Sequence, residues 1–271
     1  MSALINKVSW AAKPSTFNDP FDCAVSLIPD LDSSSLLEVI LTEAKSGNTK
    51  KITDEDIKAL EAIASSDNFE GFEHPAHEEM CTKLRNKFVS LIQDIGVISL
   101  SELDDHILMW SHYADQHQGF CVEYNRDKNN SLGSRKTLPV RYTTKLPIFT
   151  LQDLITGSKN SRREYLRSLV LSKANEWNYE REWRYIDENG NRTINLNSRI
   201  TAIIFGARMP DSHKATLIEI VNKYYDDVKF KQVVLKNDGF GLEIVKYHKP
   251  EFPIVAEPED KRFRGFIDFN L

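Results

Sequence analysis

The sequence lacks the features of a membrane protein or of a small disulfide-rich protein. It has no apolar run of about eighteen residues, so it predicts no membrane span and no membrane partner. Its first residues lack the apolar core of a secretion signal, and we therefore expect a cytoplasmic protein. The three cysteines are far apart and odd in number, which fits neither a disulfide framework nor a zinc knuckle. We expect each of them to be buried or half-buried.

The sequence also lacks an excess of positive charge, and glycine is scarce. The net charge of −5 argues against a generic nucleic-acid binder, because such binding depends on neutralising phosphates with Lys and Arg. Two short basic stretches, Arg126–Lys145 and Lys261–Arg264, are interpreted as solvated loop charge. The eleven glycines form no cluster, so the sequence contains no phosphate-cradling loop.

The residues that are present indicate one α+β domain spanning residues 1–271. A chain of this length with 41% hydrophobic residues can bury a substantial core. We find no internal repeat and no linker. Hairpin signals outnumber the alternation of strands and helices, which predicts a mostly antiparallel sheet. We expect a helical insertion near residues 33–93 and an extended C-terminal tail over residues 249–271.

Periodicity in the second half predicts individual elements. Ser161–Lys173 has the spacing of an amphipathic helix, and Leu138–Tyr142 is typical of a strand. Alternating residues over Glu182–Ile186 predict another strand. Asn189-Gly190 then predicts a hairpin turn with a returning strand at Arg192–Leu196.

The densest group of polar and titratable residues lies within Val97–Tyr124. This stretch predicts a strand, one or two helical turns, and a second strand after Gly119. We expect the functional site here. The residues that can donate, accept or move a proton are Ser99, Ser101, Asp104, Asp105, His106, His112, Tyr113, Asp115 and His117, and they lie beside Trp110.

The central stretch allows three kinds of site. His112 and His117, with either Asp115 or Asp104 and Asp105, are a mixed nitrogen and oxygen set of the kind that zinc, manganese or iron prefers. They follow a helix end and a turn instead of one helical face, so we expect no metal, and a metal-dependent nuclease or hydrolase is the lesser enzyme alternative. His112 beside Tyr113 is also a candidate general base. A ligand- or protein-binding module without catalytic activity is the third reading.

Four segments, taken in order, resemble a bacterial family, domain of unknown function 2971. The likeness is scattered over about residues 8–210. Family members usually have a Tyr-x-Tyr-Arg-like strand ahead of the first segment, which this sequence does not have. The family name implies no reaction. The four segments are Asn18–Asp22, Ser99–Ser101, Met109–Asp115 with Gly119, and Trp177–Arg184.

A second likeness is to the arginine–serine–glutamate ADP-ribosyltransferases. Ser99-Leu-Ser101 on a strand, with Glu180-Arg-Glu182 opening another, is similar to the serine and Glu-x-Glu elements of those enzymes. The resemblance implies their α+β fold, NAD as substrate, and Glu182 as the carboxylate that holds the ribose 2′-hydroxyl and stabilises the oxocarbenium-like transition state. It implies that Glu180 activates or selects the acceptor, and that Ser99 or Ser101 orients the carboxylate.

The same resemblance implies further binding residues. The arginine that binds the NAD phosphates in those enzymes has no counterpart ahead of Ser99 except Arg85, in a predicted helix, which leaves His112 and Asn18 as substitutes. Arg184 is assigned to the binding residues, with pairing to an acid across the sheet as its structural alternative. The acceptor would be an unidentified protein or nucleic acid, and such an activity would suit a toxin or a phage-defence effector. The aromatic candidates for clamping the nicotinamide are Trp110, Tyr113 and Trp177.

Overall fold

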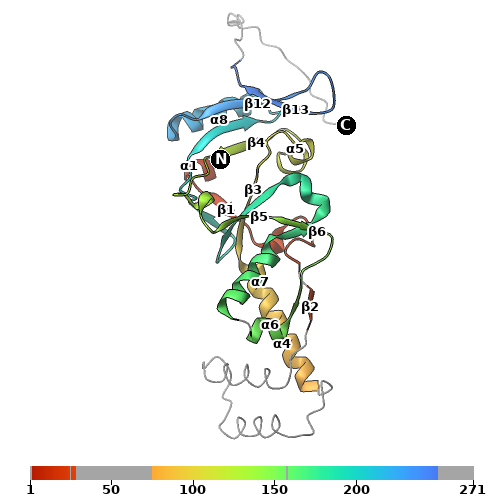
Figure 1. The fold of residues 1–271 in the computed structure, drawn as a ribbon. Coiled ribbons are helices and arrows are strands. Elements are labelled where there is room, and N and C mark those ends of the chain that lie inside the picture. Colours follow the sequence, from red (N-terminus) through yellow and green to blue (C-terminus); the bar gives the residue numbers. More distant parts are fainter. Residues whose placement is uncertain (1, 25, 29–74, 157, 250–271) are drawn as a thin grey trace, which may run out of the picture.

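The computed structural model describes residues 2–24, 26–28, 75–156 and 158–249, which form several short sheets packed against helices (Figure 1). The α+β prediction is confirmed at this level. The expected mostly antiparallel pairing is also present, since five of the eight described strand pairings are antiparallel and three are parallel, but the described strands form several sheets instead of one. Most of the predicted helical insertion and almost all of the predicted tail lie outside the described residues. Within the described ranges, no helix is long and apolar enough to cross a bilayer.

The largest sheet has the strand order β13–β12–β11–β4. β11 and β12 run parallel and are joined by helix α8 (Asp211–Tyr224), which packs on one face of the sheet together with the short helix α1 (Ser2–Ile5). The other face contacts Trp110 of helix α5 (Ile107–Tyr113). The four strands are β4 (Phe120–Tyr124), β11 (Ile200–Phe205), β12 (Lys229–Leu235) and β13 (Leu242–Lys246).

A three-stranded antiparallel sheet lies between this large sheet and the helices α4, α6 and α7 (Figure 1). Its central strand, β9 (Glu182–Asp187), pairs with β3 (Gly96–Ser101) and with β5 (Thr137–Pro139). Because side chains alternate along a strand and directly paired residues share a face, the register places both serines of β3 on the same face as two charged residues of β9. The paired residues are Ser99 with Arg184 and Ser101 with Glu182.

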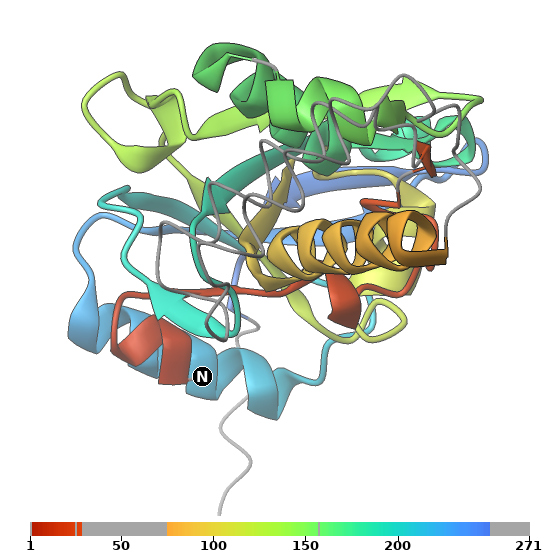
Figure 2. The same ribbon diagram turned by 90° about the horizontal axis from the view of Figure 1, so that it is seen from below.

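The remaining described strands form three two-stranded ribbons. β1 (Ser9–Ala11) pairs with β10 (Arg192–Ile194), β2 (Ser26–Ile28) with β7 (Ile148–Thr150), and β6 (Arg141–Thr143) with β8 (Ser172–Ala174). Figure 2 shows the long helix α4 from below, on the side that also carries α6 and α7. The helices and 3-10 turns here are η1 (Pro14–Thr16), α4 (Pro75–Asp94), η2 (Ser131–Gly133), α6 (Leu151–Thr156), α7 (Lys159–Leu171) and η3 (Asn175–Glu180).

Three of the predicted elements differ from the structure. The hairpin at Asn189-Gly190 is wrong, since β10 pairs with β1 and not with β9. The backbone N–H groups of this turn donate elsewhere, Gly190 to the Asp94 carbonyl at 2.8 Å and Asn191 to the Ala11 carbonyl at 2.7 Å, so the turn joins two sheets. The predicted strand Leu138–Tyr142 is split between β5 and β6, which have different partners. The predicted helix over Ser161–Lys173 ends at Leu171, and the chain continues directly into β8.

The close contact of Gly206 with the loop after α5 yields a test of this packing. A Cβ added at Gly206 would lie 2.2 Å from the His117 carbonyl oxygen and 2.8 Å from that of Gly119. We expect Gly206→Ala to lower the free energy of unfolding by about 1–3 kcal/mol, because neighbouring backbone must move. Gly239→Ala is the control, since nothing lies within 4 Å of the added Cβ. Denaturant unfolding curves measure both, and equal midpoints would contradict this packing.

Candidate functional site

A groove of about 940 Å³ is lined by β3, α5, β4 and the start of β9. Both sheets therefore contribute to its walls. Most residues that the sequence singled out lie along it, although they come from four separate segments. Those that line the groove are Asn18, Ser99, Ser101, Trp110, Tyr113, Glu180 and Glu182, and those that do not are His112, Trp177 and Arg184.

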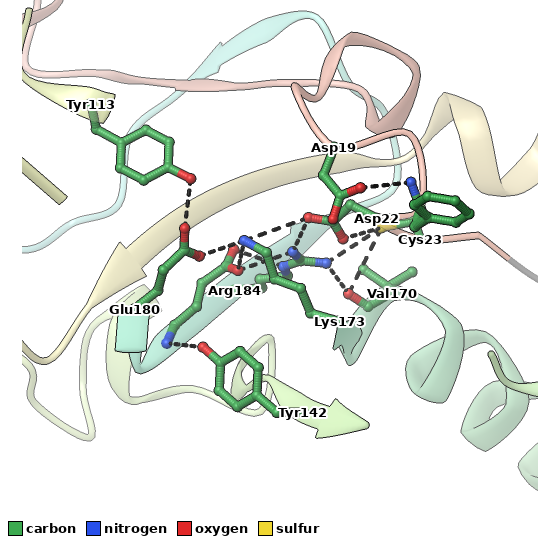
Figure 3. A network of polar contacts seen from close by, with 11 residues as sticks. Asp19, Asp22, Cys23, Tyr113, Tyr142, Val170, Lys173, Glu180 and Arg184 are labelled. Atoms are coloured by element: carbon green, nitrogen blue, oxygen red, sulfur yellow. Dashed lines mark hydrogen bonds and ion pairs between the residues drawn. The ribbon is translucent and has the colours of Figure 1, made fainter. Parts of the chain in front are cut away.

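Buried charges form one connected cluster at this groove (Figure 3). Every member is less than a tenth exposed. Three carboxylates face two cations, so the formal charge of the cluster is −3 + 2 = −1. The carboxylates are Asp22, Glu180 and Glu182, and the cations are Lys173 and Arg184.

Arg184 lies at the back of the cluster and is 0% exposed. A guanidinium has five N–H donors, and here all of them have acceptors within the protein. No donor therefore remains for a ligand, and Arg184 positions the carboxylates from behind the groove. The role of Arg184 in substrate binding stays a prediction. Its acceptors are Glu182 Oε1 (2.8 Å) and Oε2 (3.0 Å), Asp22 Oδ2 (2.6 Å), the Val170 carbonyl (2.5 Å) and Cys23 Sγ (3.4 Å).

Lys173 was missed by the sequence reasoning, although it lies where the three carboxylates converge. Its Nζ donates to Glu180 Oε2 and to Glu182 Oε2, the latter at 3.0 Å, and lies 3.7 Å from Asp22 Oδ2. Burial alone would lower the pKa of Lys173, but the two glutamates outweigh it and raise that pKa above its ordinary value. The only sequence signal was its place just after an apolar helix, with no Gly or Pro to mark the change from helix to strand.

Glu182 and Glu180 differ in the acceptor capacity that they leave unused. A carboxylate has about four acceptor positions. Glu182 accepts two hydrogen bonds from Arg184 and one from Lys173, which leaves about one position. Glu180 accepts one from Lys173 and one from the Tyr113 hydroxyl, the latter at 2.6 Å. Glu180 therefore retains about two positions on the groove side of the cluster.

Tyr113 connects the cluster to the mouth of the groove. Its side chain is half exposed and its hydroxyl donates to Glu180. Burial and the neighbouring Glu180 carboxylate raise the pKa of Tyr113 well above its ordinary range, so the phenol stays protonated and remains a donor. Figure 3 shows Tyr113 pointing at Glu180 from the opposite side to Lys173.

Glu180 does not open a strand as the sequence predicted. It ends η3, and Arg181 then takes a left-handed conformation with φ 43° before β9 begins. Ser101 stabilises this corner, because its hydroxyl donates to the Glu180 carbonyl at 2.6 Å and accepts from the Leu103 N–H at 3.0 Å. Ser101 thus contacts the backbone, whereas Ser99 helps to lower the pKa of the Glu182 carboxyl.

The aromatic and histidine candidates outside the lining lie close by. His112 is exposed, and its ring centroid is 6.1 Å from that of Tyr113 and 6.2 Å from that of Trp177. Trp177 in turn lies 5.1 Å from Lys173 Nζ. His117 Nε2 forms a hydrogen bond with the Ser111 hydroxyl at 3.1 Å. Among the residues that the structure describes, no group of three His, Cys, Asp or Glu side chains is placed to hold a metal ion, so the predicted metal alternative gains no donor set.

Residues 109–185 match the model of a family described as a protein of unknown function (DUF2971). Over this segment, which is less than a third of its length, the chain is similar to that family. The DUF2971 match includes the segments with Tyr113 and Glu180 and also Lys173, while the segments with Asn18 and Ser99 lie outside it. No curated protein and no solved structure matches the chain. The predicted family is confirmed, and its description names no activity.

Removing the central guanidinium should destabilise the fold strongly. We expect Arg184→Ala to lower the free energy of unfolding by about 3–5 kcal/mol, because it leaves two buried carboxylates without their main partner. Arg167→Ala is the matched control, since Arg167 forms an exposed helical pair with Glu164 that is worth about 0.5 kcal/mol or less. Urea unfolding measures both variants. A similar small loss in both would contradict a supporting role for the cluster.

The pKa of Glu182 predicts how the contribution of the charge cluster to stability depends on pH. Burial alone would raise that pKa, but the charge and hydrogen bonds of Arg184, with Lys173 and Ser99, bring it below the ordinary 4.5. A lowered pKa in the folded state means stability that is complete above pH 4.5 and is lost as the pH falls below it. We expect the difference in unfolding free energy between wild type and Glu182→Gln to be largest at neutral pH and to shrink below pH 4.5. A difference that grows on acidification would contradict the assignment.

Proposed function

We propose that the groove binds NAD and that the protein is an ADP-ribosyltransferase-like enzyme, which transfers the ADP-ribosyl group to an acceptor. The observation that carries this proposal is the buried Glu180–Glu182 pair, which lines a groove beside Ser99 and Tyr113. In this reaction the bond from ribose C1′ to nicotinamide breaks, and its electron pair leaves with nicotinamide. The acceptor's nucleophilic atom bonds to C1′ and loses a proton.

The charge of the cluster supports this chemistry. The ribose gains positive, oxocarbenium-like character as the leaving group departs, and fixed negative charge beside it stabilises that transition state. The cluster has a formal charge of −1 and is held by hydrogen bonds before any ligand arrives. A site that is already organised needs little reorganisation during the reaction.

The hydrogen bonds favour a division of roles between the two glutamates. Glu182 already accepts three hydrogen bonds from the two buried cations, which leaves about one acceptor position for a ligand hydroxyl. Glu180 has positions to spare and shares a hydrogen bond only with the half-exposed Tyr113 and with Lys173. We therefore assign the contact with the ribose hydroxyl to Glu180 and its orientation to Glu182, in the reverse of the order that the resemblance implied.

The groove suits NAD in size and in part of its chemistry. Its volume of about 940 Å³ is in the range of small-ligand sites. Phe17, Trp110, Tyr113 and Trp183 add aromatic surface to the wall. The acceptor would be a protein or nucleic acid, and a role as toxin or phage-defence effector would follow from that reaction class alone.

Binding and turnover of NAD test the proposal. We expect purified wild-type protein to bind NAD in calorimetry and to release nicotinamide, and Glu180→Gln to slow the release by about 10²–10³-fold, as for loss of one group that stabilises transition-state charge. Glu176→Gln is the matched control, because Glu176 is exposed on the same 3-10 turn and lies outside the groove. It should leave the rate unchanged.

Two outcomes would contradict the proposal. One is no NAD binding at millimolar concentration in protein shown by circular dichroism to be folded. The other is NAD binding with equal nicotinamide release from wild type and Glu180→Gln, which would indicate a binding module without catalysis. If Glu182→Gln, and not Glu180→Gln, abolishes turnover in a folded protein, the roles revert to those implied by the resemblance.

A further inference from the structure

Arg126 follows strand β4 and lies at the wall of the groove. Its guanidinium carbon lies 4.2 Å from the centre of the Trp183 ring, and its Nε donates to the Leu132 carbonyl at 3.0 Å. Trp183 is itself fixed, because its Nε1 donates to Glu102 Oε1 at 2.6 Å. The plane of this guanidinium is thus held in place although the side chain is exposed.

The outer end of Arg126 has no hydrogen-bond partner among the residues that the structure describes. Within the described part of the chain, neither Nη1 nor Nη2 donates a hydrogen bond, and no carboxylate forms an ion pair with this residue. The other cation that lines the groove, Lys173, is fully engaged by carboxylates. A fixed guanidinium with free Nη groups matches the geometry of a phosphate, which accepts two parallel N–H bonds.

Arg126 differs from its surroundings because most charged residues that line the groove are acidic. Carboxylates dominate its lining, so an anionic ligand would be repelled without a local positive charge. Glu123 is neutralised by Lys231 at 2.5 Å, and Glu102 is occupied by Trp183. The carboxylates that line the groove are Asp22, Glu102, Asp104, Glu123, Glu180 and Glu182.

The course of the groove separates Arg126 from the charge cluster. β3 is an outer strand of its sheet, and residues from both of its faces line the groove, Leu100 from one and Ser99 from the other. Glu182 and Trp183 are neighbours on β9 and therefore point to opposite faces. The groove passes over the edge of β3, with the carboxylate cluster on one side and Arg126 on the other.

We propose that Arg126, held on the Trp183 ring, is a phosphate-binding subsite of the groove. A ligand bound there would place a phosphate on Arg126 and a cationic or hydroxyl-bearing group at Glu180. The identification of that phosphate as the diphosphate of NAD rests on the proposed function. The phosphate subsite itself rests only on the contacts of Arg126.

Calorimetric titration with three probes tests the subsite. They are inorganic pyrophosphate, NAD, and nicotinamide riboside, which carries the nicotinamide and ribose without phosphate. We expect Arg126→Gln to weaken the binding of pyrophosphate and NAD by about tenfold to a hundredfold, as for loss of a hydrogen bond to a charged group. The affinity for nicotinamide riboside should stay unchanged. Arg135→Gln is the control, because Arg135 is an equally exposed arginine outside the groove lining.

The outcomes separate the subsite from the proposed function. Pyrophosphate binding that depends on Arg126, without any NAD binding or turnover, would support the subsite and contradict the proposed function. NAD binding and turnover that Arg126→Gln leaves unchanged would overturn the subsite and support the proposed function. Failure of all three probes to bind folded wild-type protein would overturn both.

Discussion

The buried guanidinium of Arg184 is the interaction on which the rest of this structure depends. Its five donors join strand β9 to the Asp22 segment and to the end of helix α7, three parts of the chain that are far apart in sequence. Asp22 and Glu182 are then fixed relative to each other, and Lys173 is drawn into the space between them. The groove acquires its charged side from this arrangement, because the same carboxylates that satisfy Arg184 also line it.

A cluster that served stability alone would be better balanced. Burying ions carries a desolvation penalty that ion pairing repays only with good geometry and complete hydrogen bonding. Here Arg184 meets that condition, and Glu180 does not, since the protein fills only about two of its four acceptor positions. A buried group with an incomplete set of partners beside a cavity is typical of functional sites. Glu180, the member of the cluster that stability explains least, is therefore one of the residues that line the groove.

The sequence predicted local elements and some faces, but not the pairs that depend on the whole fold. The strands β3, β4 and β9 and the helix α7 follow from periodicity, because their hydrophobic side chains report which face is buried. Alternation also placed Glu182 and Arg184 on one face of β9. The partners of the turn at Gly190 and the convergence of Lys173 on the carboxylates could not be predicted, since hydrogen bonds between distant residues leave no local pattern. Glu180 was placed on a strand because nothing in its neighbours indicates the left-handed Arg181 that follows.

A ligand proposed for the groove must suit both Glu180 and Arg126. The Glu180 side presents a carboxylate with unused acceptor positions, and the Arg126 side presents Nη groups that donate to no described residue. A purely cationic ligand would leave Arg126 without a role, and a purely anionic one would be repelled by the carboxylates. A single ligand with a phosphate at one end and a sugar or positive charge at the other satisfies both ends at once. A nucleotide has a phosphate at one end and a sugar at the other. NAD also has a positively charged nicotinamide ring on its sugar, which would lie beside the negatively charged cluster.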